Sequence, residues 1–263
     1  MTIKNWVLLA LSVLFLFLGI QSLLRYPESA QYLDTAISLD QAVVLPENEG
    51  KLVLIHGTVS MTAPVHDEKY AVTLYAPAVL RYDEVYKQTK TNQDQEEWDW
   101  VSNGQQKLTG GASLGEFDID SAIIDSFPIT DYYAAFDEDE IAAYYLYSGP
   151  HGETYLAAEE IETGATSSMI RGISAEGQEA WYYRYCDLSS AGEMTLIGIQ
   201  SGNRLVKAKA VPAVSVGVVA KEDLVSENSR VSLMSAIVSL AAGLACAFFG
   251  LRGMALKTRR KKG

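Results

Sequence analysis

The sequence predicts an α+β fold in which a strand-rich acidic domain, residues 25–229, lies between two transmembrane helices. Three observations predict it. Two stretches of about twenty residues carry no charge, and all 33 Asp and Glu residues lie between those stretches. The region between them contains many short β-branched and aromatic segments bounded by turn residues, which is typical of a strand-rich domain.

The two uncharged stretches are long enough to cross a bilayer. Residues 5–24 and 231–251 each extend about 30 Å as a helix, and basic residues bracket them closely at 4, 25, 230 and 252. The predicted spans are therefore residues 5–24 and 230–252. A cleaved signal peptide is the alternative for the first stretch, although no A-x-A site follows it, and a buried globular helix is the alternative for the second.

The basic residues predict the orientation of the chain. The tail at residues 253–263 carries five Lys or Arg residues and no acid, so we expect it in the cytoplasm. Two crossings then place residues 1–4 in the cytoplasm as well. The acidic domain is left in the periplasm, outside the cell or in an organelle lumen. The tail sets this topology and is also a candidate for adhesion to anionic membrane lipids.

Charge and cysteine content limit the chemistry of the domain. Between residues 26 and 229, 12 basic residues oppose 33 acids, which gives a formal charge of −21 and disfavours nucleic-acid binding. Of the two cysteines, Cys186 lies in the domain and Cys246 in the second span. We therefore expect no intrachain disulfide and no zinc site built on a cysteine pair.

The elements of the domain follow from periodicity and turn residues. An amphipathic helix is predicted at 31–44, and the helix of the second span is predicted to start at 223–228. Further helices are predicted at 118–127 and at 137–143, with a strand at 142–147 as the alternative to the latter. The predicted strands are 51–60, 70–75, 78–87, 96–101, 153–157, 180–186, 193–200, 204–210 and 214–220.

Glycine and asparagine mark the expected turns. Residues 46–50 and 149–152 are predicted turns, and Asn103-Gly104 and Gly202-Asn203 are predicted two-residue hairpin turns. The glycine-rich residues 109–115 are expected to interrupt the strand pattern as a loop.

One short motif resembles a known family. The turn formed by Pro46, Glu47, Asn48, Glu49 and Gly50, followed by a strand, is similar to a motif of the LUMA (transmembrane protein 43) family. Residues 66–88, 115–127 and 192–206 match further family stretches in order. The family has several closing spans and a longer tryptophan-rich insert, whereas this chain has one closing span and a shortened insert. The resemblance implies a trimmed member with a membrane-organising or scaffolding role, without a catalytic residue or cofactor.

The residues alone contain weak signals for catalysis or metal binding. Ser113 lies in a G-x-S-x-G pattern, but the polar residues before it do not suit the strand of a nucleophile elbow. The three histidines, His56, His66 and His151, have no metal-ligand spacing. Acidic runs at 94–99, 137–140 and 159–160 are candidates for Ca²⁺, yet no calcium-loop motif accompanies them. We predict no catalytic residue, metal or cofactor.

Two features suggest packing or interaction surfaces. Eight of the 15 tyrosines cluster at 132–133, 144–147 and 182–185, which is typical of either a tyrosine-rich core or an interface. In the second span the small residues Ser235, Ser239, Gly243 and Ala247 lie four apart, a spacing that lets helices approach closely. They are predicted to pack on the first span, which contains Gly19, or on a second copy of the chain.

Together these observations predict a two-pass membrane protein, not an enzyme, that contacts membrane lipids. Its predicted role is to scaffold or to bind a protein partner or a second copy of itself. The alternatives are a membrane-anchored sensor of a ligand or cation and, third, a tethered hydrolase.

Overall fold

The computed structural model describes residues 3–90, 96–149, 151–163, 172–173, 176–209 and 211–260. The chain divides into two compact units. One contains two long helices, α1 (Ile3–Asp34) and α5 (Lys221–Arg260), and the other, residues 39–208 and 213–218, contains the sheets. The predicted α+β class is confirmed.

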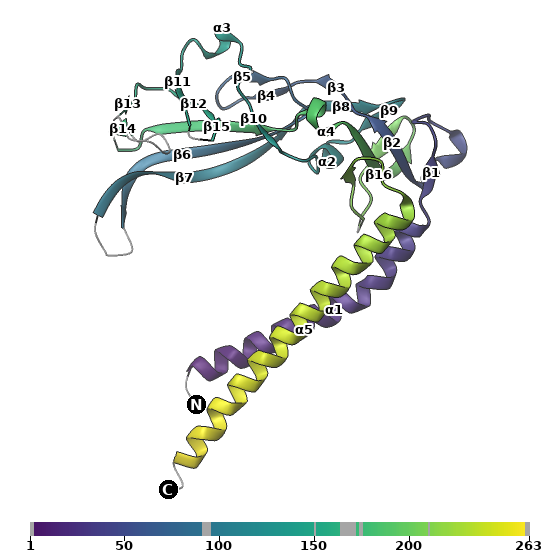
Figure 1. Ribbon diagram of the computed structural model, residues 1–263, viewed down its shortest axis with the longest axis vertical. Helices are drawn as coiled ribbons and strands as arrows, with labels where there is room; N and C mark the ends of the chain where they lie inside the picture. Colours follow the sequence, from purple (N-terminus) through teal and green to yellow (C-terminus); the bar gives the residue numbers. More distant parts are fainter. Residues whose placement is uncertain are drawn as a thin grey trace. The chain divides into compact units, whose positions relative to one another are not determined.

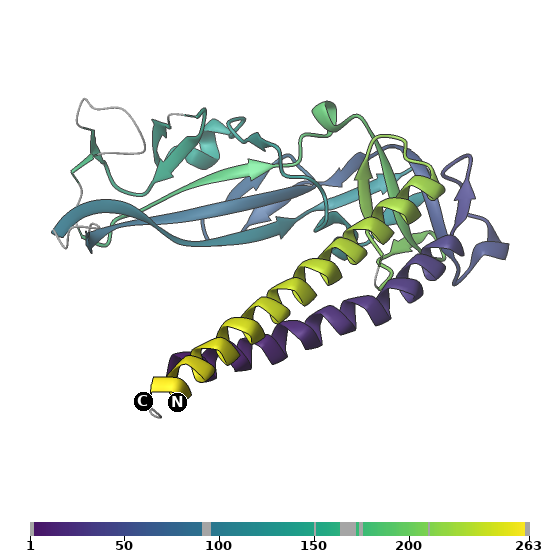
Figure 2. The ribbon, with the colours of Figure 1, turned by 60° about the horizontal axis from the view of Figure 1, so that its bottom comes forward.

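The two long helices pack against each other in antiparallel directions, side by side in both views (Figures 1 and 2). Two glycines allow this close approach. A Cβ atom added to Gly19 would lie 2.7 Å from Leu240 Cγ, and one added to Gly243 would lie 2.8 Å from Leu16 Cγ. Each helix therefore offers a glycine to a leucine of the other, which is the small-residue contact that permits tight helix pairs.

Apolar residues dominate both helices, to different lengths. Among the described residues, Trp6–Leu24 is the helical segment long and apolar enough to cross a membrane, and Leu233–Phe249 is a shorter apolar segment of α5. The helix α1 does not end with the apolar segment but continues through Tyr26-Pro27 to Asp34. The helix α5 begins at Lys221, ahead of its apolar segment, as the sequence predicts.

The helix predicted at residues 31–44 is wrong. Residues 31–34 are the last turn of α1, and β1 (Ile37–Leu39) follows. The backbone N–H and the hydroxyl of Thr35 both donate to the carbonyl of Tyr32, at 3.1 and 2.6 Å, and thereby satisfy a terminal carbonyl of the helix. The apolar spacing across this region comes from a helix end followed by a strand, which mimics one amphipathic helix.

The first sheet closes into a small barrel. Its closed path comprises β2 (Leu52–Thr58), β16 (Glu193–Ser201), β17 (Arg204–Val206), β9 (Phe117–Ile119), β8 (Gly111–Leu114) and β3 (Ser60–Ala63). Only Val59 separates β2 from β3, so one bent segment pairs with β16 at its start and with β8 at its end. Two further strands, β1 and β18 (Val214–Val216), extend this sheet from β2 and β16.

The connectivity of this barrel is recognisable. All neighbouring strands are antiparallel except β17 and β9, which are parallel. With β2 and β3 counted as one bent strand, the strand order and directions are those of an OB-fold barrel. A short helix, α2 (Ser121–Ile124), follows the third barrel strand, and its Ile123 and Ile124 are buried.

A second sheet is built from two long insertions into the barrel, residues 64–110 and 120–192. Its strands are β11 (Tyr145–Ser148), β12 (Thr154–Ala157), β15 (Glu179–Tyr185), β6 (Ala78–Lys90) and β7 (Glu96–Thr109), with β10 (Asp131–Tyr132) on β15. The remaining elements are the hairpin of β4 (Val65–Asp67) and β5 (Val72–Leu74), the pair β13 (Glu162–Thr163) and β14 (Gly172–Ile173), the helices α3 (Glu138–Ile141) and α4 (Leu188–Ala191), and a 3-10 turn (Pro46–Asn48).

Aromatic residues form the core on both faces of the second sheet. Side chains alternate between faces along a strand. On β15, Trp181 and Tyr183 therefore join one buried cluster with the β4–β5 hairpin, while Ala180 joins another with Tyr86 and Trp100. Most of the tyrosine clusters seen in the sequence thus belong to a tyrosine-rich core.

The predicted turn at Asn103-Gly104 is wrong, whereas that at Gly202-Asn203 is confirmed. The strand β7 runs straight through residues 103 and 104 as a β-bulge, with Glu84 opposite Ser102 and Asp83 opposite Gly104. Gly104 adopts φ 132°, which suits the bulge. Gly202, at φ 60°, begins the two-residue turn between β16 and β17.

Other element predictions need smaller corrections. Residues 109–115 were expected to be a loop, but most of them form β8. Of residues 118–127 only the four in α2 are α-helical, because the start of this segment pairs in the barrel as β9. Residues 137–147 contain both the predicted helix, as α3, and its strand alternative, as β11.

Candidate functional site

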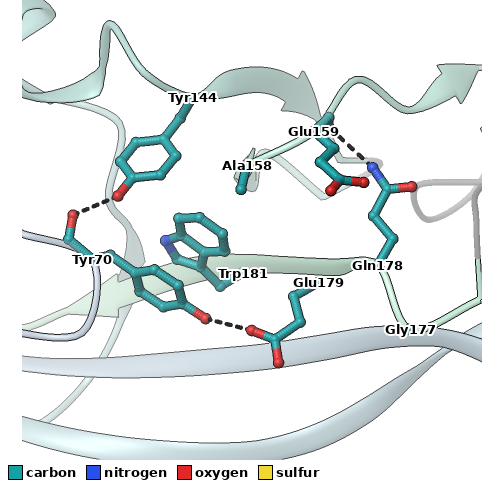
Figure 3. A pocket seen from close by; sticks show the side chains of 8 residues that line it. All are labelled: Tyr70, Tyr144, Ala158, Glu159, Gly177, Gln178, Glu179 and Trp181. Atoms are coloured by element: carbon teal, nitrogen blue, oxygen red, sulfur yellow. Dashed lines mark hydrogen bonds between the residues drawn. The ribbon is translucent and has the colours of Figure 1, made fainter.

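A pocket of about 340 Å³ lies in the strand unit, against β15 (Figure 3). Its walls are formed by three aromatic residues, two acids and three smaller or neutral residues: Tyr70, Tyr144, Trp181, Glu159, Glu179, Ala158, Gly177 and Gln178. Figure 3 shows the three rings together, with Glu179 beside the Tyr70 hydroxyl and with Glu159 and Gln178 on the opposite side. All eight residues belong to the two insertions into the barrel.

The aromatic side of the pocket is a fixed stack. Trp181 lies parallel to Tyr70, with ring centroids 3.6 Å apart, and Tyr144 meets Trp181 edge-on at 5.1 Å. The hydroxyl of Tyr144 donates to the backbone carbonyl of Tyr70 at 2.8 Å. Trp181 is almost completely buried, and its indole N–H has no partner among the described residues. Because three rings and one hydrogen bond hold each other, this wall is preorganised.

The polar side of the pocket contains two carboxylates, of which Glu179 is hydrogen-bonded and Glu159 is exposed. The Glu179 carboxylate accepts from Lys69 Nζ at 3.3 Å and from the Tyr70 hydroxyl at 3.4 Å. The Gln178 amide donates to the Glu159 backbone carbonyl at 3.0 Å and so fixes the neighbouring loop. The Glu159 side chain is exposed, and its carboxylate makes no hydrogen bond or ion pair with a described residue. The exposed carboxylate is accessible from solvent.

A buried charge network supports the pocket from behind. Arg81 Nη1 donates to both oxygens of Asp67 at 2.8 Å, Nε donates to both oxygens of Asp83 at 3.1 Å, and Nη2 donates to Gln106 at 2.9 Å. The side chains of Arg81, Asp67 and Asp83 are only 5%, 2% and 10% exposed. The Tyr70 hydroxyl donates to Asp83 at 2.9 Å, which ties the aromatic wall to this network.

The electrostatics of the network keep Tyr70, Tyr183 and Arg81 each in one protonation state. Burial and the neighbouring Asp83 raise the pKa of Tyr70, and burial and Asp67 raise the pKa of Tyr183. Burial alone would lower the pKa of Arg81, but its hydrogen bonds and the charges of the two aspartates outweigh that effect and raise it. The tyrosines therefore remain hydrogen-bond donors, and Arg81 remains charged.

The pocket and its support carry net negative charge. Three carboxylates, of Asp67, Asp83 and Glu179, face the two cations Arg81 and Lys69, which leaves one negative charge. The free Glu159 carboxylate adds a second.

The opposite face of the same sheet carries a separate carboxylate cluster. Burial, followed by the charges of Asp99 and Glu153, raises the pKa of Glu84, although a hydrogen bond with Tyr155 opposes the shift. One Glu84 carboxylate oxygen is buried without a partner. Burial and the charge of Glu84 also raise the pKa of Tyr182 to about 12.

The motif at residues 46–50 has a structural role in the barrel. The Glu49 carboxylate accepts from the N–H of Gly202 at 2.8 Å, in the β16–β17 turn. The N–H of Gly50 donates to the carbonyl of Gln200 at 2.9 Å, and the side chain of Gln200 donates to the carbonyl of Leu45 at 2.7 Å. The motif thus docks on the hairpin at 192–206, another stretch that resembles the LUMA family. Asn48 is buried, and Pro46 and Glu47 begin the 3-10 turn.

The structure does not assemble the histidines or Ser113 into a site. His56 lies on β2 with its ring nitrogen 2.8 Å from the Thr195 hydroxyl, and His66 and His151 are exposed elsewhere. Ser113 lies within β8, paired with Ser60 and Asp118, rather than on a strand-to-helix elbow. Among the described residues, no three His, Cys, Asp or Glu side chains are grouped to hold a metal ion.

The acidic runs have other surroundings. The Asp137 side chain caps α3 by accepting from the N–H of Asp139 at 2.9 Å. Glu140 accepts from the backbone N–H and the hydroxyl of Thr73, both at 2.7 Å. Glu159 borders the pocket, and residues 94–95 lie outside the described residues.

The small-residue stripe of α5 lies only partly in the helix contact. Gly243 is buried against Leu16, Ser239 and Ala247 are half-buried, and Ser235 is exposed. The fully buried small residue on that turn is Ala236, which the spacing of four missed. An α-helix has 3.6 residues per turn, so a strict four-residue stripe drifts off one face of the helix.

Comparison of the chain with protein-family models, with curated proteins and with solved structures finds no match. The resemblance to the LUMA family therefore remains a prediction from motifs. The pocket and the charge network were not predicted from the sequence. One signal for them in the sequence is Arg81 and Asp83, two opposite charges at a spacing of two, which alternation places on the same face of the strand.

Proposed function

We propose that the chain is a two-pass integral membrane protein, with spans at residues 5–24 and 230–252 and the strand unit on the non-cytoplasmic side. The observation that carries this proposal is the apolar outer surface of the helix pair. Large apolar side chains stay exposed on both helices: Trp6, Val13, Leu14, Phe17, Ile20 and Leu24 on α1, and Leu233, Met234, Ile237, Val238, Leu244, Phe248 and Phe249 on α5. Such a surface suits hydrocarbon rather than water.

Labelling of single cysteines in intact cells tests this topology. A cysteine at the exposed Ser102 is expected to react with a membrane-impermeant maleimide added outside. A cysteine at Thr258, in the basic tail, is expected to react only after permeabilisation. The reverse pattern would invert the proposed orientation, and recovery of the chain in the soluble fraction after alkaline extraction would remove the spans.

We further propose that the protein scaffolds or organises a membrane by binding a protein partner, as a trimmed LUMA-like member. The strand unit offers exposed large apolar side chains suited to contacts, namely Tyr75, Trp98, Tyr145 and Leu146. Cross-linking in intact membranes followed by mass spectrometry tests this role. Reproducible cross-links from these residues to one partner or to a second copy would support it, and an absence of intermolecular cross-links would not.

The second candidate role is a membrane-anchored ligand sensor, favoured by the preorganised pocket. A volume of about 340 Å³ lies within the range of small-molecule sites, and aromatic walls with a few placed polar groups are their usual composition. A ligand that occupies the pocket is expected to raise the melting temperature of the full chain in detergent micelles. A ligand panel that leaves the melt unchanged would remove this candidate.

A further inference from the structure

The lining of the pocket selects for positive charge. None of its eight lining residues is a lysine, arginine or histidine, whereas two are glutamates and three are aromatic. Aromatic faces and carboxylates both attract cations, the first through the ring quadrupole and the second through charge. Figure 3 shows Tyr144 to the left of the pocket and Glu159 to its right, so a cation bound between them would meet a ring and a carboxylate.

The same aromatic stack already attracts cations of the chain itself. Lys69 Nζ lies 4.6 Å from the centroid of the Tyr70 ring, and the Arg81 guanidinium carbon lies 5.1 Å from it. Because Trp181 occupies the other face of Tyr70, these two cations belong to the network behind the pocket. Among the described residues, the lining beside Trp181 and Tyr144 includes no cationic side chain.

We propose that this pocket binds a small organic cation of the alkylated ammonium class. In this assignment the half-buried Tyr144 ring contacts its apolar groups, and the exposed Glu159 carboxylate balances its charge. The inference rests on the ligand-sensing role proposed above. A bare metal ion fits less well, because it needs several converging oxygen ligands, and the Glu179 carboxylate already holds Lys69 and Tyr70. A bulky, weakly hydrated cation suits ring walls and a volume of this size.

Binding of choline to the full chain in maltoside micelles tests the proposal, with its neutral carbon isostere dimethylbutanol as the matched probe. The two molecules share size and shape and differ in charge. Titration calorimetry is expected to show choline binding at least about tenfold tighter than the isostere, since the ring and carboxylate attractions act on the charge alone.

Two neighbouring acids provide matched variants. Glu159 lines the pocket and Glu160 does not, although both side chains are exposed. Glu159→Gln is expected to weaken choline binding about two- to fivefold, as for loss of a partly exposed charge pair, and Glu160→Gln is expected to leave it unchanged. An equal effect of the two variants would show only a general field of the acidic domain and would overturn the site.

The outcomes separate this inference from the role on which it rests. Equal binding of choline and the isostere would overturn the cation assignment and leave a ligand-binding pocket. Binding of neither probe, together with an unchanged melt across the ligand panel, would remove both.

Discussion

Replacement of Arg81 by methionine tests whether the buried charge network holds the second sheet together. The variant would leave Asp67, whose side chain is 2% exposed, without a cation, and would leave Asp83, 10% exposed, with Lys69 alone; it would also remove five hydrogen bonds of the guanidinium. Breaking a buried ion pair by removal of one partner costs about 3–5 kcal/mol, because a desolvated charge is left uncompensated. We therefore expect Arg81→Met to lower the free energy of unfolding by about 4 kcal/mol.

The chain offers an exposed pair as the matched control. Arg204 donates to Asp120 at 2.8 Å, as short as the closest Arg81 contact, but its side chain is 59% exposed. Arg204→Met is expected to cost at most about 1 kcal/mol, since solvent screens the pair. Urea unfolding of the full chain in micelles, followed by tryptophan fluorescence, measures both variants, because Trp181 stacks within this core.

A triple variant separates the network from the packing of the arginine stem. Arg81→Met combined with Asp67→Asn and Asp83→Asn removes the stranded charges and is expected to recover at least about half of the lost stability. Two results would refute the reasoning. One is a loss for Arg81→Met no larger than that for Arg204→Met, and the other is a triple variant less stable than Arg81→Met alone.

Three further predictions concern the helix pair, the barrel and the second carboxylate cluster. Gly19→Leu is expected to lower the melting temperature of the full chain by overpacking the facing leucine, and Ser235→Leu on the exposed side to leave it unchanged; equal melts would contradict the helix contact. Gly115→Ala is expected to lower the free energy of unfolding in urea by several kcal/mol, because its new Cβ collides with the Ala42 carbonyl. Gly202→Ala, at a similar φ but in open space, is expected to lower it by about 1 kcal/mol. Equal losses for the two variants would be evidence against the collision. Because the pKa of Glu84 is raised, the native state keeps this proton to a higher pH than the unfolded chain does. Glu84 therefore stabilises the fold at pH values below its ordinary pKa, and this stabilisation is lost as the pH rises through the raised pKa. Glu84→Gln is expected to remove this decline and to be more stable than the parent at pH 7; unchanged pH dependence in urea titrations would show that Glu84 does not cause it.

The sequence predicts the individual strands and helices of this chain better than it predicts which strands pair with each other. Most predicted strands are present, because alternation and β-branched residues report directly on a strand face. Asn103-Gly104 shows the limit of that reasoning. The same dipeptide suits a hairpin turn or a bulge, and only the partner strand β6, which continues opposite it, decides between them.

The site is harder to predict than the fold because its residues come from distant segments. Tyr70 and Trp181 stack on each other from two different insertions, and their contact depends on how both insertions pair with the second sheet. Each residue looks like an ordinary core aromatic on its own. Conversely, the recognisable motif at 46–50 lies in the barrel, where its contacts explain a turn and no chemistry.

The barrel and the pocket of the strand unit are built from separate parts of the chain. Every strand of the barrel lies outside the two insertions, and every residue of the pocket and of its charge network lies within them. Because the bent β2–β3 segment pairs at both ends, the barrel closes through its own strands and does not need the insertions for that closure. It follows that substitutions in the pocket are expected to leave the pairing of the barrel strands intact.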